Sequence, residues 1–361
     1  MPRPSADMVR RRAILLGCGA LSGLAPLAGP ARAAAISLVE TGSSLLYPLF
    51  NLWVAAYTAQ NPAVRITTQS TGSGTGIAQA ISGIVEIGAT DAYMSNSEVR
   101  RNPGLLNIPL AISAQTINAN LPSLDQTDLR LSGPLLAGIY QGHIRRWNDA
   151  AIARINPGVA LPARPIIPIH RSDGSGDTFI FSQYLAFSTP SWAASVGYGT
   201  SLSWPPVAGG IGMLGNPGMV QVSGRTPGSL AYIGISFHAA IGKAGLGTAL
   251  LQNRAGNFVR PDAETIGAAA AAMAGKSPPD ARISLVFAPG ANSYPLINYE
   301  YAIVNRRQPE RQVAASLRDF LSWAIDPEGG STRGFLNAVG FQPLPPGAAA
   351  LARRQIAAIG T

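Results

Sequence analysis

The stretch HRSDGSGDTFIF, residues 170–181, joins a loop rich in glycine and serine to the start of an apolar run with helix-like spacing. The short apolar segment before it, PIIPI at residues 165–169, predicts a strand. A glycine-rich turn between a strand and a helix brings backbone N–H groups within reach of an anion. Asp173 and Asp177 lie in the same turn, so the question is which anion could bind beside carboxylates.

Two other segments share this order of an apolar strand-like run, a loop of glycine and hydroxyl residues, and a helix-like stretch. They are ISLVETGSSLLYPLFNLWVAAYTAQN, residues 36–61, and VRITTQSTGSGTGIAQAISG, residues 64–83. Strands that alternate with helices predict an α/β fold with largely parallel strands. Ligands of such sheets bind beyond the carboxyl ends of the strands, which is where these three loops would lie.

The three loops offer the groups that bind an oxyanion. The first turn of a helix has unpaired N–H groups and a partial positive charge of about half a unit. Serine hydroxyls add donors, and the planar guanidinium of Arg171 can bind a tetrahedral oxyanion through two parallel hydrogen bonds. A serine at a helix start is usually only an N-cap, so the three loops together, rather than any one of them, indicate an oxyanion site.

Length and composition indicate a folded protein with two domains. The chain has 361 residues, more than one hydrophobic core usually serves, and 47% of them are apolar against 12% charged. Five of the 27 basic residues and one acid fall within residues 1–33, which leaves 22 basic against 17 acidic residues, a net charge of +5. The remaining arginines form no basic stripe with interleaved aromatic residues, so nucleic-acid binding is not expected.

Residues 1–33 predict a cleaved export signal. Arg11 and Arg12 precede an apolar span, and a small-residue cleavage signal follows at residues 31–33. The arginine pair resembles the twin-arginine type of signal, which predicts a periplasmic protein. Cys18 loosely fits a lipidation site, although the apolar segment before it is short. A lipid anchor through Cys18 is therefore the alternative to cleavage after it.

Other motifs argue against catalytic chemistry. Residues 210–215, GIGMLG, match a dinucleotide fingerprint, but we interpret residues 192–218 as surface loops because they are rich in glycine, proline and serine. The three histidines, His143, His170 and His238, lie far apart without metal-ligand spacing. No activated nucleophile is visible, so we predict a protein that is not an enzyme and that binds no metal or cofactor.

An ordered set of motifs resembles one known family. The motifs are ETGSSLLYPLFNLW, TGSGTGIAQAISG, IGATDAY, LAGIYQGHIRRWND, INPG, HRSDGSGDTFIFSQYL, LAYIGISF and INYEYAIVN. Together they resemble the phosphate-binding proteins of bacterial Pst-type ABC transporters, nearest to the mycobacterial branch, over nearly the whole chain after the signal. The ordered set is specific, whereas a single motif would not be.

The resemblance implies the two-lobed periplasmic binding protein fold of type II, in which two α/β domains are joined by a two-stranded hinge. Residues 36–113 and 296–361 would form lobe I, and residues 114–295 would form lobe II. The resemblance also implies that the protein binds inorganic phosphate with high affinity in the cleft and delivers it to a membrane ABC permease. We expect a monomer.

The resemblance further implies which residues bind phosphate. They are Ser44, Leu45, Ser73, Asp91, Arg171, Ser175, Gly176 and Asp177. Asp173 would orient the arginine through a salt bridge. For Asp177 two roles stay open, because it either contacts the ligand or only supports the start of the helix.

Carboxylates in the site would select for a protonated anion. Hydrogen phosphate can donate its proton to Asp91, and the dihydrogen form could donate to Asp177 as well. Sulfate is fully ionised, so a carboxylate facing it would meet repulsion and lack a donor, at a cost on the order of several kcal/mol. Two alternatives remain, a receptor for another oxyanion such as sulfate or molybdate and a secreted phosphate-ester hydrolase.

Overall fold

The computed structural model describes residues 35–121 and 129–361. The predicted export signal and Cys18 lie outside the described residues. The segment Ala35–Thr361 forms one compact unit, to which the following description applies.

Two sheets are present among the described residues. Nine strands form the larger sheet in the order β2-β1-β3-β12-β4-β8-β6-β7, with β9 paired to β4, and the smaller sheet has the order β11-β10-β5. The larger sheet contains β1 Ile36–Gly42, β2 Val64–Ser70, β3 Ile87–Thr90, β4 Leu105–Ala119, β6 Ile167–Arg171, β7 Ile211–Met213, β8 Ser229–Gly234, β9 Gly247–Thr248 and β12 Ile297–Asn305. The smaller sheet contains β5 Arg130–Leu131, β10 Leu250–Gln252 and β11 Phe258–Val259.

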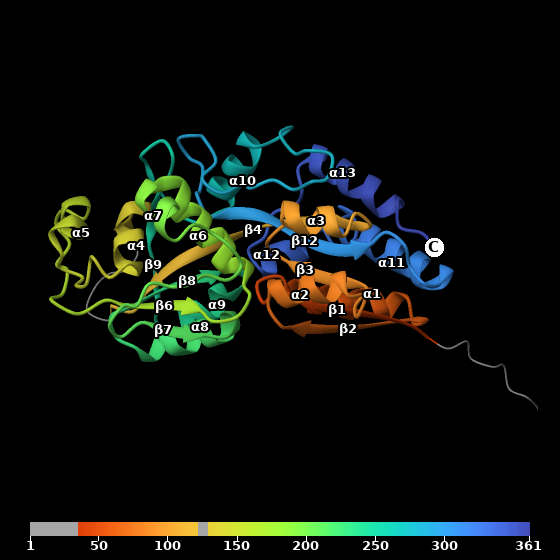
Figure 1. Cartoon of the computed structure of the whole chain (residues 1–361), viewed down its shortest axis with the longest axis horizontal. Helices are drawn as coiled ribbons and strands as arrows, with labels where there is room; N and C mark the ends of the chain where they lie inside the picture. Colours follow the sequence, from red (N-terminus) through yellow and green to blue (C-terminus); the bar gives the residue numbers. More distant parts are fainter. Residues whose placement is uncertain (1–34, 122–128) are drawn as a thin grey trace, which may run out of the picture. The chain divides into compact units, whose positions relative to one another are not determined.

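Helices connect most of the strands (Figure 1). They are α1 Tyr47–Gln60, α2 Ser73–Ile81, α3 Asn96–Arg101, α4 Gly133–Tyr140, α5 Ala150–Ile155, α6 Gly176–Ser188, α7 Pro190–Ser195, α8 Gly215–Arg225, α9 His238–Lys243, α10 Ala263–Ala272, α11 Arg311–Ala324, α12 Arg333–Ala338 and α13 Pro346–Ala357, together with the 3-10 helix η2 Ile235–Phe237. Helices α1, α2 and α11 pack beside β1–β3, while α6 and α8 pack beside β6 and β8. None of the helices in the described part of the chain has the length and apolar character that a membrane span requires.

The predicted α/β architecture is confirmed. Strand β1 pairs in parallel with β2 and β3, and β6 pairs in parallel with β7 and β8. The three predicted units of strand, loop and helix are β1–α1, β2–α2 and β6–α6. Each places a glycine-containing loop between the carboxyl end of a strand and the amino end of a helix.

Strand β4 connects the two halves of the larger sheet. Its residues 105–114 pair with β12, and its residues 115–119 pair with β8. The change of partner falls where we place the first crossing between the lobes, near residues 112–116. The lobe boundaries themselves stay a prediction.

Helix α1 brings the N-terminal part of the described chain into contact with α11, which lies in its C-terminal part. Its buried residues Leu49, Phe50, Trp53 and Tyr57 recur at helical spacing, as the sequence predicts. The ring of Tyr57 lies 5.1 Å from that of Phe320 in α11. Burying each large apolar side chain stabilises the fold by about 1.5–3 kcal/mol. In Figure 1 the orange α1 and the blue α11 accordingly lie on the same part of the sheet.

The interpretation of residues 192–218 as surface loops is wrong in part. This segment contains the end of α7, strand β7 and the start of α8, and β7 pairs in parallel with β6. Pro217 does not prevent the helix, because it stands in the first turn, where the N–H has no intrahelical acceptor. The GIGMLG motif, residues 210–215, therefore contains strand β7 and the first residue of α8, and it is not a loop.

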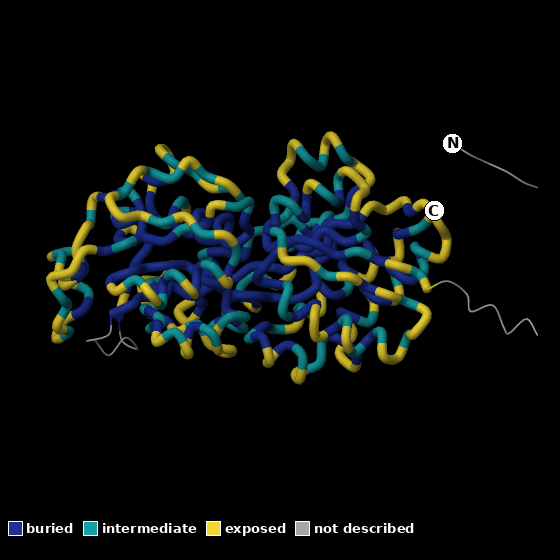
Figure 2. The backbone as a smooth tube through the Cα atoms, turned by 90° about the horizontal axis from the view of Figure 1, so that it is seen from below, coloured by how far each residue is buried: buried dark blue, intermediate teal, exposed yellow. Residues whose placement is uncertain are grey.

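The buried residues form a continuous core. In Figure 2 they follow the strands through the centre of the molecule, whereas exposed segments lie at its rim. The C-terminal helix α13 buries Leu351, Ala352 and Ile356 and packs against β4 and α11. Because β4 is almost wholly buried, the core holds this strand in place, together with the loops at the ends of its neighbouring strands.

Candidate functional site

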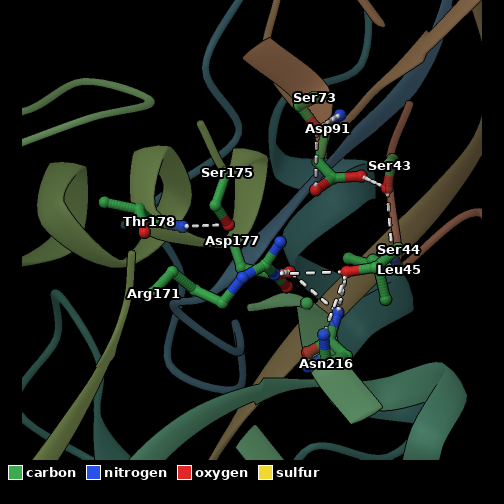
Figure 3. Close-up of polar contacts among 12 residues, drawn as sticks. Ser43, Ser44, Leu45, Ser73, Asp91, Arg171, Ser175, Asp177, Thr178 and Asn216 are labelled. Atoms are coloured by element: carbon green, nitrogen blue, oxygen red, sulfur yellow. Dashed lines mark hydrogen bonds and ion pairs between the residues drawn. The ribbon is translucent and has the colours of Figure 1, made fainter. Parts of the chain in front are cut away.

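The loops that follow β1, β3 and β6 meet at one place (Figure 3). Ser43 and Ser44 follow β1, Asp91 directly follows β3, and Arg171 is the last residue of β6. Ser73 begins α2 and points to the same place. The structure thus brings predicted site residues together at the carboxyl ends of parallel strands, where ligands of α/β proteins bind.

Two glycines permit this close approach. Gly42, at the end of β1, has φ 142°, and a Cβ there would overlap the carbonyl oxygen of Ala89. A Cβ on Gly176, the first residue of α6, would overlap the carboxyl group of Asp91. Any larger residue at either position would force the loops apart.

Asp91 is the acceptor on one side of the site. Its side chain is buried, with a residue exposure of 1%. The hydroxyl of Ser43 donates to Oδ1, and the hydroxyl of Ser73 donates to Oδ2 over 3.3 Å. Burial raises the pKa of the Asp91 carboxyl, while its hydrogen-bond donors and the charge of Arg171 oppose this shift. Asp91 can therefore accept a further hydrogen bond from a protonated ligand.

Arg171 is the cationic centre of the site and is 3% exposed. Its Nε donates to Oδ1 of Asp173 over 2.7 Å, and its Nη2 donates to Oδ2 of the same carboxylate. Its Nη1 donates to Oδ2 of Asp177 over 2.6 Å and to the hydroxyl of Ser44 over 3.2 Å. Burial raises the pKa of Asp173, but the hydrogen bond and the charge of Arg171 outweigh it, so the pKa of Asp173 is lowered. The bidentate ion pair between Arg171 and Asp173 holds the guanidinium plane in one orientation.

Asp177 lies on the opposite side of the guanidinium from Asp173 and uses both of its oxygens. Oδ1 accepts from Nε2 of Gln115 over 2.8 Å, and Oδ2 accepts from Arg171 and from Nδ2 of Asn216 over 2.8 Å. Burial, followed by the charge of Asp91, raises the pKa of Asp177 to about 7, although Arg171 acts in the opposite direction. The carboxyl of Asp177 therefore changes its charge near neutral pH.

The serine hydroxyls of the predicted site and the backbone N–H of Leu45 also form hydrogen bonds. Ser44 accepts from the backbone N–H and Nδ2 of Asn216 over 3.1 and 3.0 Å. The N–H of Leu45 donates to the hydroxyl of Ser43 over 3.1 Å. Ser175 is the N-cap of α6, since its hydroxyl accepts from the N–H of Thr178 over 3.2 Å. Figure 3 shows these residues together with Asp91 and Arg171.

Sequence reasoning missed three residues of this cluster. Ser43 donates to Asp91, and Asn216 and Gln115 donate to Asp177. Asn216 follows the GIGMLG motif directly, so the signal for it was the glycine-rich turn that we interpreted as a loop. Gln115 lies on β4 and carries no local signal.

The arrangement combines fixed donors with carboxyl acceptors. Arg171, the serine hydroxyls and the first N–H groups of α2 and α6 can donate to oxygen atoms of an anion. Asp91 and Asp177 can only accept while they are ionised. Within residues 35–121 and 129–361, no group of three or more His, Cys, Asp or Glu side chains could hold a metal ion. The chemistry of the cluster is that of binding a tetrahedral anion that still carries a proton.

Comparisons with known proteins agree with this geometry. A family model described as a PBP superfamily domain matches residues 28–328. The phosphate-binding protein PstS of Xylella fastidiosa is 36% identical over 311 residues, which cover 86% of this chain and 82% of the relative. PstS3 of Mycobacterium bovis is 30% identical over 326 residues, covering 86% and 83%. The mycobacterial proteins are thus among its relatives.

The fold is also similar to solved structures. One is the high-affinity periplasmic phosphate-binding protein PfluDING with bound phosphate, which has a TM-score of 0.69, 20% sequence identity and coverage of 88% of this chain and 93% of that one. At this identity the likeness shows the fold alone. The predicted two-lobed periplasmic binding protein fold is confirmed, and the chain belongs to the PBP superfamily and, within it, to the family of the phosphate-binding protein PstS.

Proposed function

We propose that the protein binds inorganic phosphate at an anion site and is not an enzyme. The anion site consists of the side chains and amides predicted for it, Ser44, Leu45, Ser73, Asp91, Arg171, Ser175, Gly176 and Asp177. The observation that carries the proposal is the burial of Arg171 between carboxyl groups, with serine hydroxyls and helix starts around it. A site of this kind has donors for the oxygens of phosphate and acceptors for its protons.

The two carboxyls account for selectivity. Hydrogen phosphate can donate its proton to Asp91, whose oxygens already accept from two serines. Sulfate has no proton to donate, so ionised Asp91 would face it as an unpaired buried acceptor, which costs about 1–3 kcal/mol or more. The site therefore discriminates against sulfate because sulfate has no proton for Asp91, whereas the donors of the site would bind either anion.

Asp173 orients the guanidinium of Arg171, and Asp177 and the ligand would both bind to Nη1 of that guanidinium. The pair of Asp173 and Arg171 fixes the guanidinium plane, which leaves Nη1 directed to Ser44 and Asp177. Phosphate binding would exchange some contacts of Nη1 for contacts to phosphate oxygens. In this proposal Asp177 contacts the ligand and also holds Arg171 through Nη1.

We further propose that the protein works outside the cytoplasm as a monomer and delivers phosphate to an ABC permease. The resemblance to Pst-type receptors and the periplasmic origin in the name of PfluDING support this role.

Calorimetric titration of the anion-stripped mature protein tests the function. Phosphate and then sulfate are added at several values from about pH 5 to about pH 9, the range in which phosphate and buried carboxyls titrate. We expect one phosphate per protein and a preference over sulfate of about 100-fold or more, the equivalent of about 3 kcal/mol. Equal affinities, or tighter sulfate binding, would contradict phosphate as the ligand.

A matched pair of variants assigns the preference to the anion site. Asp91→Asn keeps the shape of the side chain but adds a donor and removes the charge, so the preference for phosphate should fall about tenfold or more. Asp280→Asn is the control, because Asp280 pairs with Arg282 at a half-exposed position and forms no hydrogen bond or ion pair with the described residues of the anion site. Loss of preference in both variants would argue against a specific role for Asp91.

A further inference from the structure

Glu300 on β12 is a buried carboxyl that the binding site as predicted does not use. The residue has 0% exposure. Its Oε1 accepts a hydrogen bond from the hydroxyl of Ser113 on the neighbouring strand β4. Its Oε2 receives no hydrogen bond from the described residues. A buried carboxylate oxygen without a donor is costly, which indicates that Oε2 carries a proton.

The acceptor for that proton is Asp91. The carboxyl group of Glu300 lies in hydrogen-bonding contact with the carboxyl group of Asp91. Strand β12 also contacts the same residue through Asn298, whose Nδ2 donates to the backbone oxygen of Asp91 over 2.7 Å. Glu300 and Asn298, both on β12, therefore both contact Asp91.

Regular strand alternation places Glu300 beside Asp91. Side chains two residues apart on a strand lie on the same face, and Asn298 and Glu300 of β12 are two residues apart. Asn298 already donates to the backbone of Asp91, so Glu300 lies on the face of β12 that contacts Asp91. Along β4, Leu110 is left unpaired between the partners of Glu300 and Tyr301.

Two carboxyls in contact share a single proton, and the surroundings decide which of them holds it. Asp91 accepts from the hydroxyls of Ser43 and Ser73 and faces the cation of Arg171. Among the described residues, Glu300 accepts a hydrogen bond from Ser113 alone, and it faces the carboxyls of Asp91 and Asp177. Burial, then the charge of Asp91, raises the pKa of Glu300 well above its ordinary value. The proton belongs on Glu300.

We propose that Glu300 is a positioning residue that stays protonated and donates a hydrogen bond to Asp91, which keeps Asp91 ionised and directed at the ligand. The inference rests on the proposed function, because Asp91 needs to be ionised in order to accept the proton of phosphate. No bond forms or breaks in this role. Losing the donor would make Asp91 more basic, so protonation of Asp91 would begin to block phosphate at a higher pH.

Two substitutions separate the hydrogen bond from the shape of the side chain. Glu300→Gln keeps a donor towards Asp91 and an acceptor for Ser113, and it cannot titrate. Glu300→Met has a similar length and removes the donor. Glu40→Gln is the control, since Glu40 is another buried carboxyl, on β1 near the backbone of Gln69, and has no contact with Asp91 among its polar interactions.

Phosphate affinity from about pH 5 to about pH 9 is the first measurement. Glu300→Gln and Glu40→Gln should stay within about threefold of the wild-type protein, whereas Glu300→Met should bind phosphate about tenfold more weakly or worse, as expected for a lost bond to a charged group. The acid-side fall in affinity should move to higher pH in Glu300→Met alone. Wild-type affinity and an unshifted profile in Glu300→Met would overturn the proposal.

The infrared spectrum of the phosphate-free protein is the second measurement, and it does not depend on ligand binding or on the affinity of a damaged variant. At about pH 8, above the ordinary pKa of carboxyls, the wild-type protein minus Glu300→Gln should show the stretching band of a protonated carboxyl. Absence of that band would refute the protonated state of Glu300. If the wild-type protein binds no phosphate, the proposed function fails, and the infrared result still decides the state of Glu300.

Discussion

The backbone N–H of Gly74 donates to the carbonyl oxygen of Gly174 over 2.8 Å, which joins the start of α2 to the loop before α6. These two segments belong to the lobes that we place on either side of the hinge. A Cβ built on Gly74 would lie 3.0 Å from the Cα of Gly174. The contact between these two loops therefore depends on a glycine at residue 74.

Gly74→Ala should weaken phosphate binding by about tenfold, the equivalent of about 1.4 kcal/mol, because the two loops have to separate by a few tenths of an ångström. Thermal stability should not fall, since alanine is the better residue within α2. Calorimetry and thermal unfolding measure the two effects. Gly267→Ala in α10, where nothing lies within 4 Å of the added Cβ, is the control and should bind phosphate normally. Unchanged affinity in Gly74→Ala would show that the lobes close without this contact.

Arg171→Lys should reduce phosphate affinity by about 100-fold or more. Lysine keeps the positive charge, but it cannot hold Asp173 through two parallel hydrogen bonds and reach Ser44 and Asp177 at the same time. Two lost bonds to charged groups are worth about 3 kcal/mol or more. Titration with phosphate checks the loss. The matched control is Arg318→Lys, because Arg318 donates to the carbonyl oxygen of Ile359, far from the anion site in the chain, and retained affinity is expected there.

Asp177→Asn should flatten the pH dependence of anion binding. The pKa of Asp177 is about 7, so in the wild-type protein its carboxyl is neutral below that pH and repels anions above it. Sulfate is the suitable probe because it does not titrate in this range. Wild-type affinity for sulfate should fall as pH rises through about 7, and the variant should lose most of that fall. The same slope in both proteins would assign the titration to another group.

Glu40→Met should stabilise the protein at neutral pH. Burial raises the pKa of Glu40 well above its ordinary value, although the nearby backbone of Gln69 acts in the opposite direction, and neither carboxyl oxygen accepts a hydrogen bond of ordinary geometry from the described residues. A group with a raised folded-state pKa contributes its full stability below the unfolded pKa of about 4.3, and this is lost as pH rises through the folded pKa. An apolar residue of similar length removes that loss, which is worth about 1–3 kcal/mol.

Urea unfolding at about pH 4.5, near the unfolded pKa of about 4.3, and at about pH 7.5, well above it, measures this effect. The difference in free energy of unfolding between Glu40→Met and the wild-type protein should be larger at the higher pH. A difference that is the same at both values would indicate that Glu40 does not titrate on folding.

Much of the fold and of the site could be predicted from the sequence. Strand, loop and helix follow one another at residues 36–60, 64–81 and 167–188, as the apolar periodicity and the glycine-rich turns indicate. Arg171, Asp91 and Ser73 do meet. The strand β7 and helix α8 were missed because Pro217 and the glycines suppressed the local signal, although pairing with β6 stabilises the strand.

The sequence by itself determined the family, three units of strand, loop and helix, and the residue types of the anion site, because these depend on local patterns and on motifs in a fixed order. Only the tertiary structure decided the partners of the carboxyls. Asn216 reaches Ser44 from 172 residues away, and Glu300 on β12 reaches Asp91 from a strand that lies far along the chain. Burial and contact between distant side chains set the charge of each carboxyl, and neither can be read from neighbours in the sequence.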